Sequence, residues 1–200
     1  TDAMGNVAVE LRHVIGAAGA ISDADVVHDH TLVGPILAAE RGDRRVVTTC
    51  HGSFDQTLTP LYRHISEQVE VIAISHDQAS RARDVRIAAV IHHGIEPERF
   101  PVGSGDGDYL LFLGRLSPDK GAHIAARVAR EVGMPLVLAA KCREAAEHEY
   151  FEHQLAPLLG GNIEYVGEVC GTEKLGLLGG ARALLNPIAW PEPFGLVMIE

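Results

Sequence analysis

Cysteines, basic residues and long apolar runs are all scarce in this sequence, and each shortage excludes a class of protein. Its three cysteines, Cys50, Cys142 and Cys170, form no CxxC or repeating pattern, which is unlike a disulfide framework and suits a reducing compartment. Only 17 Lys and Arg stand against 27 Asp and Glu, and a net charge of −10 argues against nucleic acid, because phosphate neutralisation needs clustered cations. We therefore expect a cytoplasmic protein that does not bind nucleic acid.

No apolar run approaches the roughly 18 to 20 residues that are needed to span a bilayer. We therefore expect no transmembrane segment, while peripheral membrane contact stays open. The composition, 46% hydrophobic and 22% charged, is typical of a globular protein with a core. The first residues carry no basic-then-apolar signal segment, but they already look helical, so we expect the natural N-terminus to lie further upstream.

Short β-branched runs alternate with amphipathic stretches along the whole sequence, a pattern typical of βα units that build parallel sheets. The expected strands are residues 25–28, 46–50, 69–75, 88–92, 109–114, 136–140, 163–166 and 183–186. The expected helices are residues 4–19, 32–41, 57–68, 76–83, 118–132, 144–158, 172–179 and 194–200. The sequence thus predicts an α/β fold.

Residues 101–108 (PVGSGDGD) are glycine-rich, acidic and non-periodic, as in a flexible connection that packs against little. We place a domain boundary there, between an N-terminal domain of residues 1–102 and a C-terminal domain of residues 103–200. Four or more strands on each side predict two Rossmann-like parallel-sheet domains that face each other across a cleft. Such sheets usually hold about six strands and the last helix stops at Glu200, so we expect both domains to be partial, in a fragment that lacks both natural ends.

The segment LLFLGRLSPDKG, residues 110–121, predicts a buried strand, a tight turn at Gly114 and a helix with Ser117 as its N-cap. Free backbone N–H groups and the helix dipole favour a phosphate at such a helix start. Arg115 and Lys120 would add charge-assisted hydrogen bonds to a diphosphate. The alternative is that both cations are ordinary solvated residues around a helix start.

Two glutamates, Glu192 and Glu200, bracket the expected start of the last helix. The N–H groups of residues 194–197 would face an anion or a sugar hydroxyl, and the carboxylates would accept hydrogen bonds from vicinal hydroxyls of a sugar or ribose. The alternative is simple complementarity with the helix dipole, which contributes ~0.3 to 1 kcal/mol.

Histidines gather at the ends of the predicted strands of the first half. His28 and His30 would point to one face, but without a third ligand they make a poor zinc site. His51 ends a strand and would face the crevice, so we predict an active-site role, with capping of the next helix as the alternative. The two Asp-x-Asp triplets, residues 23–25 and 106–108, precede strands rather than follow them, so we predict no metal site.

Several of these strings resemble motifs of the retaining glycosyltransferases of family 4, which have the GT-B fold. Residues 114–121 resemble the family's Gly-Arg-Leu-x-x-x-Lys-Gly motif, residues 192–200 its paired glutamates, and residues 49–52 its Thr-x-His-Gly motif. Residues 164–169 resemble, more weakly, its base-binding strand end. The resemblance implies catalytic roles for Arg115, Lys120, Glu192 and His51, and donor binding by Gly114, Val169, Phe194, Gly195, Leu196, Val197 and Glu200.

The resemblance further implies transfer of a sugar from a nucleoside-diphosphate sugar, with a UDP-sugar favoured, to an unknown small-molecule, glycan or lipid acceptor. It implies neither metal nor cofactor, and a leaving diphosphate stabilised electrostatically. In the family the first glutamate contacts the donor sugar, the second contacts the ribose, and main-chain groups near the position of Val169 read the base. The alternatives are a nucleotide-sugar-binding fragment without turnover and a sugar-nucleotide epimerase of the same fold.

Overall fold

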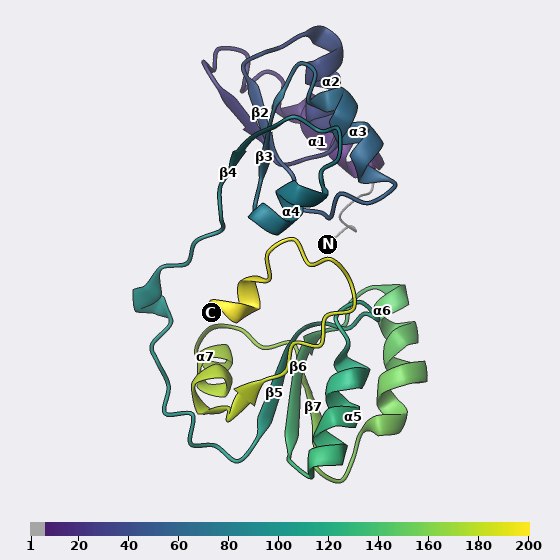
Figure 1. The fold of residues 1–200 in the computed structure, drawn as a ribbon, viewed down its shortest axis with the longest axis vertical. Helices are drawn as coiled ribbons and strands as arrows, with labels where there is room; N and C mark the ends of the chain where they lie inside the picture. The colour runs from purple at the N-terminus through teal and green to yellow at the C-terminus, as the bar shows by residue number, and fades with distance from the viewer. Residues whose placement is uncertain (1–6) are drawn as a thin grey trace. The chain divides into compact units, whose positions relative to one another are not determined.

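The structure, a computed structural model, describes residues 7–200, which divide into two units by their contacts (Figure 1). The first unit runs up to His93 and includes residues 191–194. The second comprises residues 94–190 and 195–200. Each unit is built on a parallel four-stranded sheet, so the predicted α/β class is confirmed. Residues 4–6 of the first expected helix lie outside the described residues.

The sheet of the first unit has the strand order β1-β2-β3-β4. Its elements, in chain order, are α1 (Val7–Ala17), β1 (Val27–Asp29), α2 (Val33–Arg41), β2 (Val46–Thr49), α3 (Leu58–Ile65), β3 (Glu70–Ala73), α4 (His76–Arg81) and β4 (Ile87–Val90). Ile65, Val69 and Val71 are fully buried in its core. Of these, Val71 lies in β3, Ile65 ends α3 and Val69 directly precedes β3, so the core forms where the helix packs against the sheet.

The sheet of the second unit has the strand order β7-β6-β5-β8. Its strands are β5 (Leu110–Arg115), β6 (Leu136–Lys141), β7 (Ile163–Gly167) and β8 (Ala183–Leu184). The chain therefore moves outward from β5 to β7 and then returns to the other side of β5. That reversal is the topological switch point at which open α/β sheets bind ligands, beyond the carboxyl ends of the strands.

Helices cover both faces of the second sheet. Figure 1 shows α5 (Ala122–Val132) and α6 (Ala145–Tyr150) on one face and α7 (Gly171–Gly180) on the other. The α6 segment continues as a π-turn, η2 (Phe151–Leu155), and a 3-10 turn, η3 (Ala156–Leu158). Four alanines of α5 are fully buried against the strands, and their small side chains let the helix approach the sheet closely: Ala122, Ala125, Ala126 and Ala129.

The glycine-rich stretch at residues 101–108 is not a loose connection, contrary to the expectation from its composition. The N–H groups of Gly105 and Gly107 donate to the carbonyls of Gly179 and Gly180, each at 2.9 Å. A Cβ on Gly103 would lie only 2.1 Å from backbone atoms of Gly179. The glycines therefore allow this stretch to lie against the C-terminal end of α7, and close packing explains them better than flexibility.

The helix after β5 begins later than expected. Residues 117–121 form a turn in which the carbonyl of Ser117 accepts the N–H groups of Lys120 (3.1 Å) and Gly121 (3.2 Å). Helix α5 then starts at Ala122, because Gly121 adopts a left-handed conformation with φ 76°. The prediction that Ser117 caps this helix is wrong.

The prediction of a last helix at residues 194–200 is also wrong. Only a single 3-10 turn forms there, η4 (Leu196–Met198). Gly195 precedes it in a left-handed conformation, φ 81°, which prevents an α-helix from running through this position from Phe194.

Candidate functional site

A cavity of about 290 Å³ lies at the carboxyl ends of β5 and β6, beside the switch point of the second unit. Five of the predicted donor-binding residues line this cavity together: Gly114, Val169, Leu196, Val197 and Glu200. They come from the end of β5, the loop after β7 and the last turn η4. The tertiary structure therefore brings together residues that lie up to 86 positions apart in the sequence (200 − 114).

The turn after β5 carries the two predicted cations. Arg115 ends the strand, and its guanidinium lies 3.4 Å from the Asp119 carboxylate. The Lys120 ammonium lies 5.5 Å from the centre of the Trp190 ring, within the range of a cation–π contact. Ser117 adds a buried hydroxyl that has no hydrogen-bond partner among the described residues. The turn thus presents two cations and a hydroxyl donor, a set suited to phosphate oxygens.

Glu147 organises a second group of charges next to this turn. It is buried, and its Oε2 accepts the backbone N–H groups of Arg143 (2.7 Å) and Glu144 (3.1 Å) at the start of α6. Burial tends to raise its pKa, but these hydrogen bonds and the Lys141 ammonium outweigh burial, so the pKa of Glu147 is lowered. Glu147 is therefore ionised at neutral pH, 3.4 Å from Lys141 and 3.9 Å from Arg115.

Lys141 and Glu147 show what sequence reasoning missed in this unit. Lys141 looks like a surface lysine in the sequence, yet it ends β6 and lines the cavity. The sequence did contain a signal for Glu147. Two glutamates spaced as Glu144-x-x-Glu147 shortly after a strand can form a capping box, and these two do so at the start of α6. A buried carboxylate at that position needs a cation, and the lysine that ends the preceding strand supplies it.

Glu200 forms the shortest ion pair of the cavity. Its Oε2 lies 2.6 Å from the Lys174 ammonium, and both side chains are mostly buried. Lys174 comes from α7, and nothing in the sequence singled it out. Because η4 is only a single turn, the expected row of helical N–H groups at residues 194–197 does not form.

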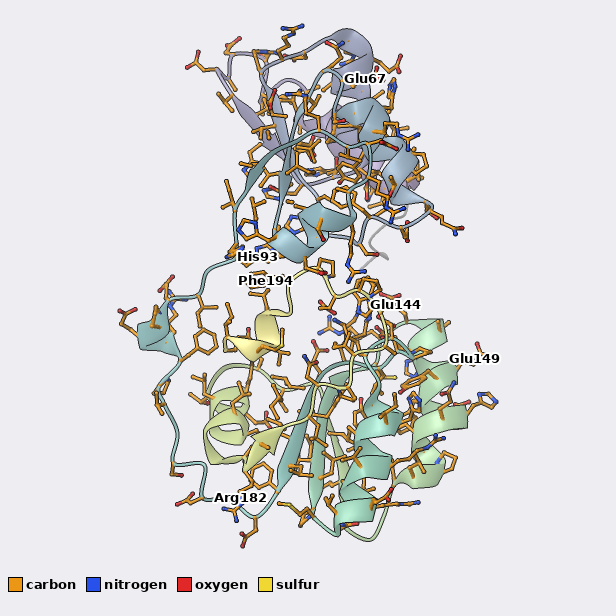
Figure 2. All side chains as sticks on the ribbon, viewed as in Figure 1. Glu67, His93, Glu144, Glu149, Arg182 and Phe194 are labelled. Carbon is orange, nitrogen blue, oxygen red and sulfur yellow. The ribbon has the colours of Figure 1, made fainter. Side chains whose placement is uncertain are left out.

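The other residues of the last segment group with the first unit by their contacts. Phe194 packs edge-on against His93, with ring centres 5.1 Å apart (Figure 2). Glu192 belongs to the same short segment of the first unit. Neither residue lines the cavity of the second unit, so their predicted roles stay predictions.

Four histidines meet at the carboxyl ends of the strands in the first unit. His51 follows β2 and stacks on His93, with ring centres 5.4 Å apart. Its Nε2 lies 2.8 Å from Nδ1 of His30, whose ring is 4.2 Å from that of His28. Among the described residues no group of three or more His, Cys, Asp or Glu side chains is arranged to hold a metal ion. The cluster is instead joined by ring contacts and by one imidazole–imidazole hydrogen bond.

The loop that carries His51 is held by a buried glutamine. The side-chain amide of Gln78 donates to the carbonyls of Cys50 (2.9 Å) and Gly52 (2.7 Å), on both sides of His51. Its Oε1 accepts the N–H of Ile74. Gln78 is therefore a positioning residue for His51, and it satisfies backbone groups that would otherwise be buried without partners.

The histidine cluster predicts a pH dependence of stability. Burial, followed by the neighbouring histidines, lowers the pKa of His51, and burial together with His30 lowers that of His28. The unfolded chain therefore binds more protons in mild acid than the folded one, and stability is lost as the pH falls below the ordinary histidine pKa of about 6.5. We expect the melting temperature to fall by a few degrees between about pH 7.5 and about pH 5.5.

A thermal-shift series over pH checks this expectation. His51→Asn should flatten part of the pH dependence, because it removes one member of the cluster. The matched control is His153→Asn in the second unit, which should leave the slope unchanged. A melting temperature that does not change over this range would contradict the expectation.

Both units of the chain are similar to parts of known proteins. Residues 6–99 match the sequence profile described as Glycosyltransferase Family 4. The solved structure of AviGT4, a glycosyltransferase involved in avilamycin A biosynthesis, is 28% identical and is matched over 88% of this chain, with a TM-score of 0.61. Residues 6–99 are thus similar to glycosyltransferase family 4, and the match to AviGT4 extends the similarity into the second unit.

More distant structures show that this chain has the GT-B fold. The Anabaena protein Alr3699/HepE, in complex with UDP and glucose, is 18% identical, with a TM-score of 0.76 over 99% of this chain. UDP-N-acetylglucosamine 2-epimerase from Rickettsia bellii is 14% identical, with a TM-score of 0.55 over 91% of this chain. A search of curated proteins finds no match.

The chain spans only part of the length of these proteins. It covers 51% of AviGT4, 62% of the HepE chain and 57% of the epimerase. Within residues 7–200, none of the helices has the length and apolar character that crossing a membrane requires.

Proposed function

We propose that this chain belongs to glycosyltransferase family 4 and forms the donor-binding unit and part of the acceptor-side unit of a retaining glycosyltransferase. The reaction moves a hexosyl group from a nucleoside-diphosphate sugar to a small-molecule, glycan or lipid acceptor in the cytoplasm, without metal or cofactor. The observation that carries the proposal is the cavity at the switch point of the second unit, where Gly114, Val169 and Glu200 meet beside the cationic turn.

The cationic turn supports the chemistry of the leaving group. When the bond between sugar and phosphate breaks, negative charge develops on the diphosphate. Arg115 and Lys120 donate charge-assisted hydrogen bonds to such an anion, and these strengthen as the charge grows. In our proposal the leaving phosphate oxygen takes the acceptor proton, and no side chain acts as a nucleophile.

The carboxylates support recognition of the rest of the donor. Glu200 lies in the cavity and, as an acceptor-only group, is suited to the two hydroxyls of a ribose. We assign Glu192 to the donor sugar and His51 to the region of the donor sugar and acceptor. The likeness to HepE in its complex with UDP and glucose favours a UDP-sugar as the donor.

Binding of UDP to the wild-type chain is expected to change the fluorescence of its single tryptophan. Trp190 lies under the Lys120 ammonium, so a diphosphate that binds Lys120 alters the electrostatic surroundings of the indole. A fluorescence titration should saturate with a dissociation constant of roughly 1 μM to 1 mM. No change in fluorescence, and no heat of binding by calorimetry, would contradict the proposed donor site.

The structural likeness to an epimerase favours a second candidate function, epimerisation of the nucleotide sugar. The two functions differ in their need for an acceptor. We expect the full-length protein to convert a UDP-sugar only when an acceptor is present, with the anomeric configuration retained in the product. Conversion of the sugar without any acceptor, followed by NMR, would favour epimerisation.

A further inference from the structure

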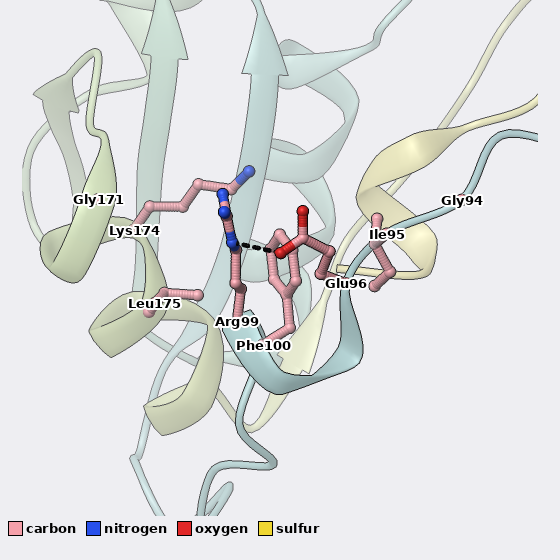
Figure 3. A pocket seen from close by; sticks show the side chains of 8 residues that line it. All are labelled: Gly94, Ile95, Glu96, Arg99, Phe100, Gly171, Lys174 and Leu175. Atoms are coloured by element: carbon pink, nitrogen blue, oxygen red, sulfur yellow. Dashed lines mark ion pairs between the residues drawn. The ribbon is translucent and has the colours of Figure 1, made fainter.

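The donor cavity contains two lysines, and each pairs with a carboxylate that is mostly buried. Lys174 pairs with Glu200, and it also lines a separate groove of about 600 Å³ between α7 and the 3-10 turn η1 (Pro97–Arg99) (Figure 3). Lys141 lies at the end of β6, and its ammonium is 3.4 Å from Oε1 of Glu147. Lys174 is thus shared with the groove, whereas Lys141 and its carboxylate lie next to the turn after β5.

Glu147 also contacts Arg115, the cation at the end of β5 that we assign to the diphosphate. Arg115 and Lys141 are partners in the register of β5 and β6, so two like charges stand side by side at one edge of the sheet. Such a pair is unfavourable without a counter-charge. Oε1 of Glu147 supplies that charge, 3.4 Å from the Lys141 ammonium and 3.9 Å from Nε of Arg115.

Glu147 is held more firmly than an ordinary surface acid. It is only 4% exposed, and its Oε2 accepts two backbone N–H groups at the start of α6. Its Oε1, in contrast, has no hydrogen-bond partner among the described residues. A buried carboxylate oxygen in that state is costly and calls for an explanation, and its place between two cations provides one.

Arg115 is clamped between Glu147 and a second carboxylate. Its Nε lies 3.9 Å from Glu147, and its Nη2 lies 3.4 Å from Asp119. Neither contact uses Nη1, and a guanidinium carries five N–H donors in a rigid plane. With two sides of the plane fixed, the remaining donors keep one direction, which is the condition for binding a phosphate oxygen without reorganisation.

A carboxylate so close to the proposed diphosphate would also repel it. Lys141 removes this conflict, because its ammonium lines the donor cavity and cancels the charge of Glu147. Glu144 also contacts the lysine, at 3.2 Å, but its side chain is 45% exposed, and an ion pair in water contributes little. The buried pair of Lys141 and Glu147 therefore matters more than the exposed one.

We propose, on the basis of the proposed function, that Glu147 is a positioning residue for Arg115 and that Lys141 neutralises Glu147. Glu147 holds the guanidinium in the direction from which it meets the diphosphate, so its effect on the donor passes through Arg115. The alternative is that Glu147 acts only by its charge. Its removal would then strengthen UDP binding whether or not Arg115 is present.

A double-mutant cycle of Glu147 and Arg115 tests this role, with the dissociation constant of UDP measured by calorimetry and by Trp190 fluorescence. Glu147→Gln keeps an oxygen that can accept the N–H groups at the start of α6, but it loses the charge that pairs with Arg115. We expect Glu147→Gln to weaken UDP binding roughly threefold to tenfold. In the Arg115→Ala background the same substitution should cause no further loss.

Lys141→Met tests the neutralising role. It should weaken UDP binding when Glu147 is present, because it leaves the buried carboxylate uncompensated, and it should change the affinity less than about twofold in the Glu147→Gln background. The double variant removes the buried ion pair as a whole, which a fold tolerates better than the loss of one partner. The cycle with Arg115→Ala can therefore be measured in the double variant if Glu147→Gln alone does not fold.

The matched control is Glu144→Gln, a change of the other glutamate of the same capping box. Because its ion pair with Lys141 is exposed, this variant should change UDP affinity less than about twofold. Turnover of a UDP-sugar by the full-length protein gives a second readout. A misplaced Arg115 should lower kcat more than it raises KM, since its bonds to the diphosphate strengthen as charge develops, and an unchanged kcat in Glu147→Gln would contradict the positioning role.

The outcomes separate this inference from the proposed function. An equal loss of UDP affinity with and without Arg115, or a gain of affinity in Glu147→Gln, would overturn the positioning role and leave the donor site in place. A wild-type chain that binds no UDP, or an Arg115→Ala variant that binds UDP as tightly as the wild type, would instead overturn the proposed function.

Discussion

Replacing Arg115 or Lys120 with alanine is expected to weaken UDP binding by roughly tenfold to a hundredfold in each case. Each cation lies in the turn after β5, at the switch point of the sheet, and each would donate charge-assisted hydrogen bonds to the diphosphate. Removal of either side chain leaves an anion that only one cation and the backbone compensate. Isothermal titration calorimetry with UDP measures the loss.

The double variant sharpens this prediction. Because both cations act on one diphosphate, their effects are expected to be non-additive, and the double variant gives the coupling between them. The matched control is Arg130→Ala, at the other end of α5, where the guanidinium donates to the carbonyl of Leu158. That variant should bind UDP with wild-type affinity. Unchanged affinity in both single variants at Arg115 and Lys120 would show that the donor-site assignment is wrong.

Gly121→Ala is expected to lower the free energy of unfolding more than any other glycine-to-alanine substitution near the site. Gly121 has φ 76°, a conformation that costs a residue with a Cβ about 1–2 kcal/mol. The new Cβ would also lie 2.3 Å from the carbonyl oxygen of Pro187, so the backbone must shift, at a further cost of about 1–3 kcal/mol. Since Gly121 follows Lys120 directly, the shift should also weaken UDP binding.

Another glycine of the same helix provides the control. Gly133 ends α5 with φ 69°, and an added Cβ would meet nothing within 4 Å. Gly133→Ala should therefore show the conformational strain alone and leave UDP binding unchanged. Melting temperatures by circular dichroism compare the two, with about 2–4 °C expected per kcal/mol for a chain of this size. Equal losses in the two variants would show that the contact with Pro187 carries no cost.

Much of the fold follows from local sequence patterns. All eight expected strands form, because runs such as residues 110–113 and 136–140 are apolar throughout, as strands buried on both faces of a sheet must be. The sequence patterns predict the ends of the helices and strands less accurately than their existence. Gly121 and Gly195 start α5 and η4 later than the side-chain pattern suggests, because the backbone conformation of a glycine overrides neighbouring helix signals.

The sequence by itself determined the α/β class and the eight strands, since each depends on residues close together in the chain. It also predicted donor binding by Gly114, Val169 and Glu200, which the structure brings to one cavity. The tertiary structure alone decided that Lys174 meets Glu200, that Glu147 joins Lys141 to Arg115, and that His30 bonds to His51. These contacts join separate strands and helices. They depend on which strands and helices lie side by side, and local periodicity carries no information about that arrangement.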